Sequence, residues 1–143
     1  MVDFEVRTIS DVATVPFDAV LALYDAVGWT AYTRAPDIVR AALAGSSFVA
    51  AAFADDRLIG LVRAVSDDAS ICYVQDVLVH PDAHRSGVGA ALMAAVAARY
   101  AHVRQQVLLT DDEPGQGAFY ESLGFAEIRD VPDAALRAFV RFS

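Results

Sequence analysis

The sequence predicts an α+β fold of about seven strands and four helices. Apolar residues alternate as in strands in some segments and recur at helical spacing in others, in the order β-α-α-β-β-β-α-β-α-β-β. Strands and helices do not alternate throughout, which argues against a doubly wound parallel sheet. A length of 143 residues fits one domain, so we expect residues 1–143 to form a single domain with a sizeable core.

The first half of the chain predicts three strands and two helices. Gly28 is a natural end for the first helix, and Pro36 suits the first turn of the second. Asp55 and Asp56 separate two apolar runs, which is a hairpin signal. The strands are expected at 4–9, 48–54 and 58–65, and the helices at 20–27 and 37–44.

The second half predicts four strands and two helices. The apolar run 107–109 is short and continuous, as expected of a strand buried on both faces. Leu92, Met93 and Val96 have the spacing of a core-facing helix side, and Gly124 closes the last helix. The strands are expected at 71–79, 107–109, 125–129 and 139–142, and the helices at 87–100 and 116–123.

Composition excludes several classes of function. The formal charge is −8 and the chain has no lysine, so sequence-independent binding of nucleic acid is not expected. The acidic field would attract cationic small molecules or protein amines, unless it serves solubility alone. No apolar run approaches the roughly 20 residues of a membrane span, and the first residues are acidic, so we expect a cytoplasmic protein without membrane contact. The single Cys72 predicts a core thiol, and no metal site is expected.

A turn with two glycines predicts an anion-binding helix start. Gly87 and Gly89 have no Cβ, so their backbone can take a positive φ and approach a ligand closely. The first turn of the following helix has unpaired N–H groups that suit a phosphate. The alternative is a helix that merely follows a flexible turn. The glycine pattern is neither the three-glycine dinucleotide fingerprint nor a P-loop, which needs Gly-Lys-Ser/Thr.

The segment 77–93 resembles motif A of the GNAT N-acetyltransferase superfamily, in which a strand, His-Pro and Q/R-x-x-G-x-G/A open a long helix. Here the motif reads His84-Arg85-Ser86-Gly87-Val88-Gly89, with His84 in place of the usual Gln or Arg. The segment 118–125 resembles the superfamily's A-x-x-F-Y-x-x-x-G-F element with a shortened lead. The resemblance covers nearly the whole chain and is to small bacterial single-domain members.

The resemblance implies a mixed central sheet in which strands 71–79 and 107–109 splay apart around acetyl-CoA. The backbone of Val77, Leu78 and Val79 would pair with the pantetheine arm, unless this segment is plain core strand. No metal is implied. The pyrophosphate would be held by His84, Arg85, Ser86, Gly87, Val88, Gly89 and Ala90.

The implied activity is acetyl transfer from the thioester to a primary amine by direct attack. Tyr120 matches the position of the general acid that protonates the leaving thiolate; alternatively, it belongs to an aromatic core face with Phe119. Asp76 is a candidate to accept the amine's proton through water, with Tyr73 and Gln75 on the opposite face of the strand. The alternative for Asp76 is a carboxylate satisfied by backbone N–H groups.

Acceptor recognition is expected near Trp29 and Tyr32, whose rings can form an apolar or cation-attracting wall. The run 23–29 resembles small bacterial and plastid-type acetyltransferases, some of which act on arylalkylamines. Alternatively, Trp29 only pins two helices together. Glu113 stands where many members have a cofactor-contacting Asn, and the acidic run 111–113 is either a solvated turn or an anionic rim for an ammonium substrate.

Two alternatives concern the protein as a whole. A GNAT-fold module could bind acyl-CoA or a protein without turnover, and a homodimer is compatible with the resemblance.

Overall fold

Five strands form one mixed sheet in the order β1-β2-β3-β4-β5. The computed structural model describes residues 2–133 and 135–143. The first three pairings are antiparallel, and β4 and β5 run parallel. The strands are β1 (Glu5–Thr8), β2 (Phe48–Ala54), β3 (Arg57–Ser66), β4 (Ile71–Val79) and β5 (Gln105–Leu108). The α+β class and the mixed sheet are confirmed.

The chain divides into two compact units, one up to Leu108 and one from Leu109 onwards. The first holds the whole sheet. The expectation of a single domain therefore stays a prediction. Among the described residues, none of the helices has the length and apolar character that a bilayer crossing needs.

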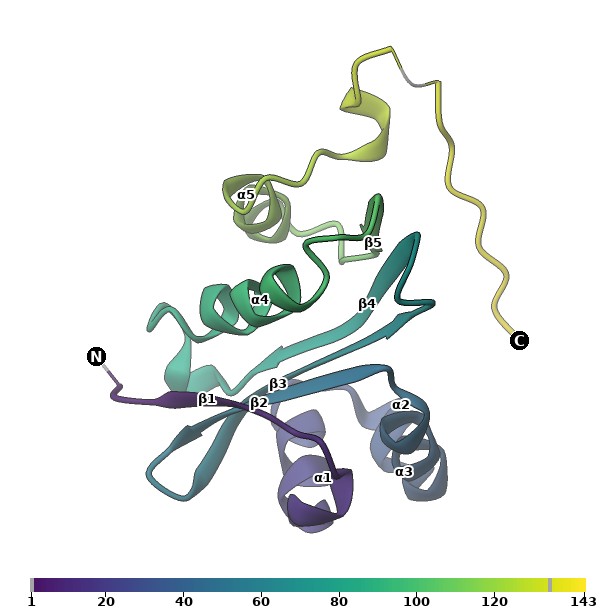
Figure 1. Cartoon of the computed structure of the whole chain (residues 1–143). Coiled ribbons are helices and arrows are strands. Elements are labelled where there is room, and N and C mark those ends of the chain that lie inside the picture. Colours follow the sequence, from purple (N-terminus) through teal and green to yellow (C-terminus); the bar gives the residue numbers. More distant parts are fainter. Residues whose placement is uncertain (1, 134) are drawn as a thin grey trace. The chain divides into compact units, whose positions relative to one another are not determined.

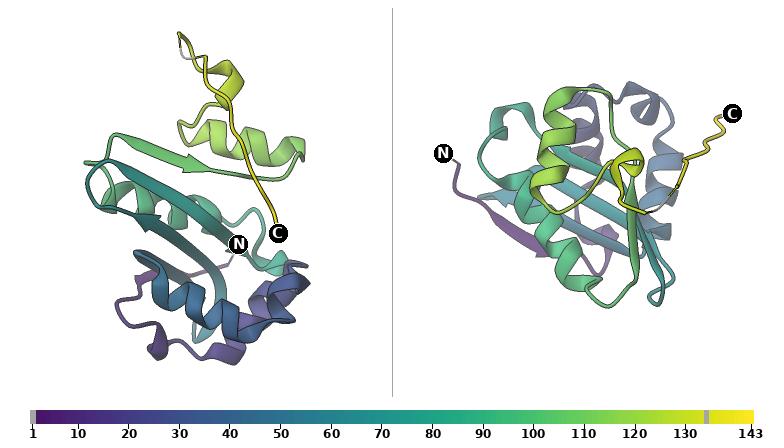
Figure 2. Two further views of the ribbon diagram at one scale, coloured as in Figure 1. Left: turned by 90° about the vertical axis from the view of Figure 1, so that its right-hand side faces the viewer. Right: turned by 90° about the horizontal axis from the view of Figure 1, so that it is seen from above.

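Helices cover both faces of the sheet in the first unit (Figures 1 and 2). On one face lie α1 (Phe17–Ala26), α2 (Thr30–Thr33) and α3 (Pro36–Gly45), and on the other lies α4 (Val88–Arg99). Buried residues of α1 and α3, such as Leu23 and Leu43, pack against Leu61 and Leu78 of the sheet. This layered core fixes α1 and α4 relative to the central strands.

Local turn chemistry explains the hairpins. Asp55, between β2 and β3, has φ +52°, and Asp68, between β3 and β4, has φ +59°. Aspartate tolerates this left-handed conformation better than most residues. The Asp67 carboxylate accepts the backbone N–H groups of Ala69, Ser70 and Ile71 at 2.8–3.0 Å. These bonds fix the start of β4.

An extra residue interrupts the pairing of β4 with β3. Arg63 lies opposite Asp76, whereas the next residue of β3, Ala64, lies opposite Val74, so Gln75 has no partner position. Such a bulge bends its strand and increases the local twist. Beyond it, β4 also loses its other neighbour, because β5 pairs only with the four residues from Ile71 to Val74. The predicted opening between these two strands is confirmed, and it begins at the bulge.

The second unit contains α5 (Pro114–Ser122) and a short 3-10 turn at Ile128–Asp130. The Glu113 side chain accepts the N–H of Gly115 at 3.2 Å and caps α5, and Gly124 follows the helix with φ +93°. The described residues after Asp130 form neither helix nor strand (Figure 1).

Most predicted elements are confirmed to within a few residues, but three predictions are wrong. The strands at 125–129 and 139–142 are absent, so the described sheet has five strands instead of seven. Phe139 and Phe142 are almost fully exposed, because no described strand pairs with their segment. The run 107–109 is not buried on both faces: β5 is an edge strand, and Leu109 is half exposed. The sequence also gave no signal for the four-residue helix α2.

Gly60 sets how closely α4 approaches the sheet. A Cβ built at Gly60 would lie 2.8 Å from Cγ1 of Val88 and 3.0 Å from Cδ1 of Leu92, both in α4. We expect Gly60→Ala to lower the free energy of unfolding by about 1–3 kcal/mol, because overpacking forces the helix or strand to shift.

Urea denaturation of the whole chain measures this, with Gly45→Ala as the matched control. A Cβ at Gly45 meets no atom within 4 Å. Equal stability of the two variants would contradict the close approach.

Candidate functional site

The opened part of β4 presents backbone groups at its free edge. The N–H of His80 donates to the carbonyl oxygen of Ile59 at 2.8 Å, so His80 faces β3. In an antiparallel pair, successive residues direct their peptide groups to opposite sides of the strand. Val79 and Val77 therefore direct their N–H and C=O groups away from β3, whereas Leu78 faces it. Of the three predicted backbone contacts, only Val77 and Val79 lie on the free edge.

A tight turn follows β4 and leads directly into α4. The 3-10 turn at Pro81–Ala83 is anchored by Ala83, which is buried. Arg85 then adopts φ +63° and Gly87 adopts φ +83°. A positive φ is costly for arginine and free for glycine. The expectation of a positive φ at Gly89 is wrong, because Gly89 lies inside the first turn of α4.

The start of α4 has backbone donors with no acceptor. Among the hydrogen bonds of the described residues, none is donated by the N–H groups of Gly87, Val88, Gly89 or Ala90, and no side chain caps the helix. The helix is twelve residues long, so its dipole adds partial positive charge at this end. The turn therefore offers an anion a set of free donors beside the free edge of β4.

The two side chains that begin the motif differ in their contacts. His84 lies 3.1 Å through its Nε2 from the carbonyl oxygen of Val79. Arg85 is exposed, and its guanidinium makes no ion pair or hydrogen bond with the described residues. Within the motif, Arg85 therefore has the charged side chain that is free to contact an anion.

Asp76 lies in a buried hydrogen-bonded group of three side chains. Its Oδ2 accepts the Tyr24 hydroxyl at 2.7 Å and Nε of Arg63 at 2.6 Å. Asp76 is 1% exposed. Its second oxygen, Oδ1, has no hydrogen bond within the described residues. The carboxylate is thus satisfied by side chains, not by the backbone N–H groups considered from the sequence.

The contacts within this group shift the pKa values of Tyr24 and Arg63. Burial, together with the Asp76 charge and hydrogen bond, raises the pKa of Tyr24 far above its usual range. Burial lowers the pKa of Arg63, but the hydrogen bond and charge of Asp76 outweigh that and raise it. The Tyr24 hydroxyl therefore remains a hydrogen-bond donor, and Arg63 remains a cation, throughout the physiological pH range. Sequence reasoning did not assign either residue a role, although an arginine inside an apolar strand was a usable signal.

The bulge corrects the predicted orientation of Tyr73. Without an extra residue, Tyr73 and Asp76 would lie on opposite faces of β4. Because Gln75 is inserted, the alternation reverses and Tyr73 lies on the same face as Asp76. Burial raises the pKa of Tyr73, with smaller contributions from the charges of Asp76 and Tyr32. Tyr73 and Asp76 therefore share the face of β4 that α1 covers.

An aromatic cluster lies over Tyr24. The ring centroids of Trp29 and Tyr32 are 6.1 Å and 5.1 Å from that of Tyr24, and 6.1 Å from each other. Both outer rings pack partly against the core and keep part of their surface exposed. The structure thus brings together the predicted acceptor residues Trp29 and Tyr32 with Asp76, while Trp29 also joins α1 to α2.

Tyr120 lies on α5 in the second unit. Its ring makes edge contacts with Phe119 and Phe125, at centroid distances of 5.0 Å and 6.1 Å. Burial raises the pKa of Tyr120, so it holds its proton at neutral pH. Its hydroxyl makes no hydrogen bond with the described residues.

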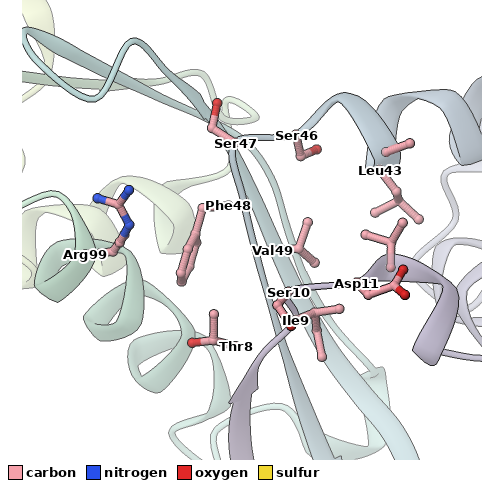
Figure 3. Close-up of a pocket in the computed structure, with 12 residues that line it drawn as sticks. Thr8, Ile9, Ser10, Asp11, Leu43, Ser46, Ser47, Phe48, Val49 and Arg99 are labelled. Atoms are coloured by element: carbon pink, nitrogen blue, oxygen red, sulfur yellow. The ribbon is translucent and has the colours of Figure 1, made fainter.

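A hollow of about 410 Å³ lies elsewhere in the first unit (Figure 3). Its lining comes mainly from the end of β1, the end of α3 and the start of β2. Asp11, Ser46 and Arg99 in this lining are engaged with Ala13, Ala42 and Asp68. No residue of β4 or of the turn after it contributes, so the hollow is separate from the candidate site.

These features define a class of protein: a mixed α+β fold that offers free helix-start amides and an opened strand edge to an elongated ligand bearing phosphate. The chain belongs to the GNAT acetyltransferase family, because the family model for the acetyltransferase (GNAT) domain matches residues 22–139.

Relatives and solved structures agree with this assignment. The chain is 30% identical to the uncharacterized N-acetyltransferase ycf52 of Pyropia yezoensis, over 76% of this chain and 63% of that protein. It is 35% identical to the uncharacterized N-acetyltransferase ycf52 of Gracilaria tenuistipitata var. liui, over 72% of this chain and 58% of that protein. The chain thus spans about three fifths of the length of these curated relatives.

Among solved structures, a GNAT family acetyltransferase from Streptococcus pneumoniae TIGR4 superposes with a TM-score of 0.81 at 29% identity, covering 99% of this chain and all of that one. A putative acetyltransferase of the same family from Xanthomonas campestris pv. campestris gives a TM-score of 0.71 at 25% identity, covering 95% and 94%.

The buried group around Asp76 predicts a stability effect. Tyr24→Phe removes one donor and leaves the rest of the ring, so we expect the free energy of unfolding to fall by about 1–3 kcal/mol. Tyr32→Phe is the matched control, since the Tyr32 hydroxyl has no hydrogen bond within the described residues. Chemical denaturation measures both variants, and equal losses would show that the Tyr24 hydroxyl contributes nothing to Asp76.

Proposed function

We propose that this chain is an acetyl-CoA-dependent N-acetyltransferase that moves an acetyl group to a primary amine. The observation that carries the proposal is the set of free N–H groups from Gly87 to Ala90, beside the free edge of β4 at Val77 and Val79. The family match spans both compact units, so we propose that both belong to one functional domain.

The residues present fit acetyl-CoA. The free amides at the start of α4, with the Arg85 guanidinium, would hold the diphosphate. Val77 and Val79 would bind the amide groups of the pantetheine arm, as a strand edge binds an extended partner. When bound, acetyl-CoA supplies an activated acyl group as a thioester.

The acceptor would bind near Trp29 and Tyr32. The exposed parts of their rings attract an amine that arrives as a cation. The carboxylate of Asp76 lies beneath this cluster, with its charge paired to Arg63. A lysine-like amine with a pKa near 10.4 is only about one part in 10³ neutral at pH 7, so its proton must be removed before attack. Asp76 can accept that proton only through Oδ1 and a water molecule, because Oδ2 is held by Tyr24 and Arg63.

Release of coenzyme A from acetyl-CoA tests the function directly. The assay uses a panel of arylalkylamines, polyamines and lysine-bearing peptides. We expect at least one amine class to stimulate release well above the rate without amine. Binding of acetyl-CoA without stimulated release by any amine would instead favour a binding module that does not turn over.

We propose Tyr120 as the general acid that protonates the leaving thiolate, in line with its place in the A-x-x-F-Y-x-x-x-G-F element and its retained proton. Tyr120→Phe should lower kcat roughly 10²-fold with little change in acetyl-CoA affinity. Tyr100→Phe is the matched control, because the buried Tyr100 hydroxyl has no hydrogen-bond partner among the described residues and lies outside the candidate site. If Tyr120→Phe turns over at the wild-type rate, Tyr120 is a packing residue.

A further inference from the structure

The His84 side chain makes a hydrogen bond that a phosphate-binding side chain would not make. Its Nε2 lies 3.1 Å from the carbonyl oxygen of Val79. A carbonyl oxygen only accepts hydrogen bonds, so Nε2 must carry the proton and donate it. The ring is thus directed back to the end of β4.

This bond ties the turn to the opened strand edge. Val79 directs its peptide groups away from β3, so its carbonyl has no partner in the sheet. The backbone N–H of His84 already donates to the carbonyl oxygen of Pro81 at 3.2 Å. With its side chain bound to Val79, His84 joins the turn to the strand immediately before the two left-handed residues, Arg85 and Gly87.

We propose that His84 is a positioning residue that holds the free amides of α4 in register with β4, and that Arg85 alone supplies the positive charge to the diphosphate. The inference rests on the proposed binding of coenzyme A. It has a chemical consequence at Val79, where the carbonyl is used by His84 and only the N–H is free. A ligand therefore meets a free donor at Val79, and the carbonyl oxygen of Val77 is the acceptor that His84 leaves unoccupied.

Calorimetric titration with coenzyme A tests this without an acceptor amine. The proteins are the wild type, His84→Ala, His84→Gln and Arg85→Ala, each measured at pH 8 in low and high salt. A bond that only positions the turn brings no charge to the ligand, so its contribution to binding should depend little on salt. His102→Ala is the matched control, because His102 is an exposed histidine bonded to Asp68. Thermal melts check that each variant is folded.

We expect His84→Ala to weaken binding about threefold to tenfold at both salt concentrations, the range that one hydrogen bond gives. His84→Gln should restore most of the affinity, because its side-chain amide can donate to Val79. Arg85→Ala should weaken binding mainly at low salt and flatten its salt dependence. His102→Ala should bind like the wild type.

Two results would overturn the inference while leaving the proposed function intact. If His84→Ala flattens the salt dependence as Arg85→Ala does, His84 is a phosphate ligand. If folded His84→Ala binds coenzyme A as tightly as the wild type, the bond to Val79 positions nothing. Failure of the wild type to bind coenzyme A at all would instead refute the proposed function.

Discussion

One inserted residue in the central strand determines the arrangement of the candidate site. Because Gln75 has no counterpart in β3, β4 bends there, and its pairing with β5 ends at Val74. The remainder of the strand keeps one neighbour in the described sheet and directs the peptide groups of Val77 and Val79 away from β3, where the Val79 carbonyl oxygen accepts a hydrogen bond from His84. The same insertion places Tyr73 and Asp76 on one face, under the aromatic cluster of α1 and α2. Both the proposed cofactor site and the proposed acceptor site therefore depend on the bulge.

The ion pair of Arg63 and Asp76 lies directly beside that bulge and joins it to α1 through Tyr24. A buried carboxylate is costly unless it is paired and hydrogen-bonded, and removing one partner of a buried pair typically costs about 3–5 kcal/mol. The three residues thus keep one another in place across β3, β4 and α1. In the proposed acceptor site, Asp76 is thus held in place by two side-chain partners.

Local signals predicted most of the fold, and long-range pairing explains the errors. Proline at Pro36 and glycines at Gly28 and Gly124 marked helix ends because these residues act through their own backbone preferences. The alternation of side chains between the two faces of a strand gave the wrong face for Tyr73, because it assumes that no residue is inserted. The segment around Phe139 has strand-like composition, but composition does not say whether a partner strand exists. The turn after β4 was located from its motif, whereas the partners of Asp76 required the structure.

Gly60 connects the two parts of the proposed cofactor site without touching a ligand. It pairs with Val79 on the opened edge, and its missing side chain admits Val88, the first residue of α4. Because the side chain of Gly60 is a single hydrogen atom, the start of α4 can lie close to the strand. In the proposed cofactor site, this contact sets the spacing between the helix start that would hold the phosphates and the strand edge that would hold the amides. Gly60 itself contributes no functional group.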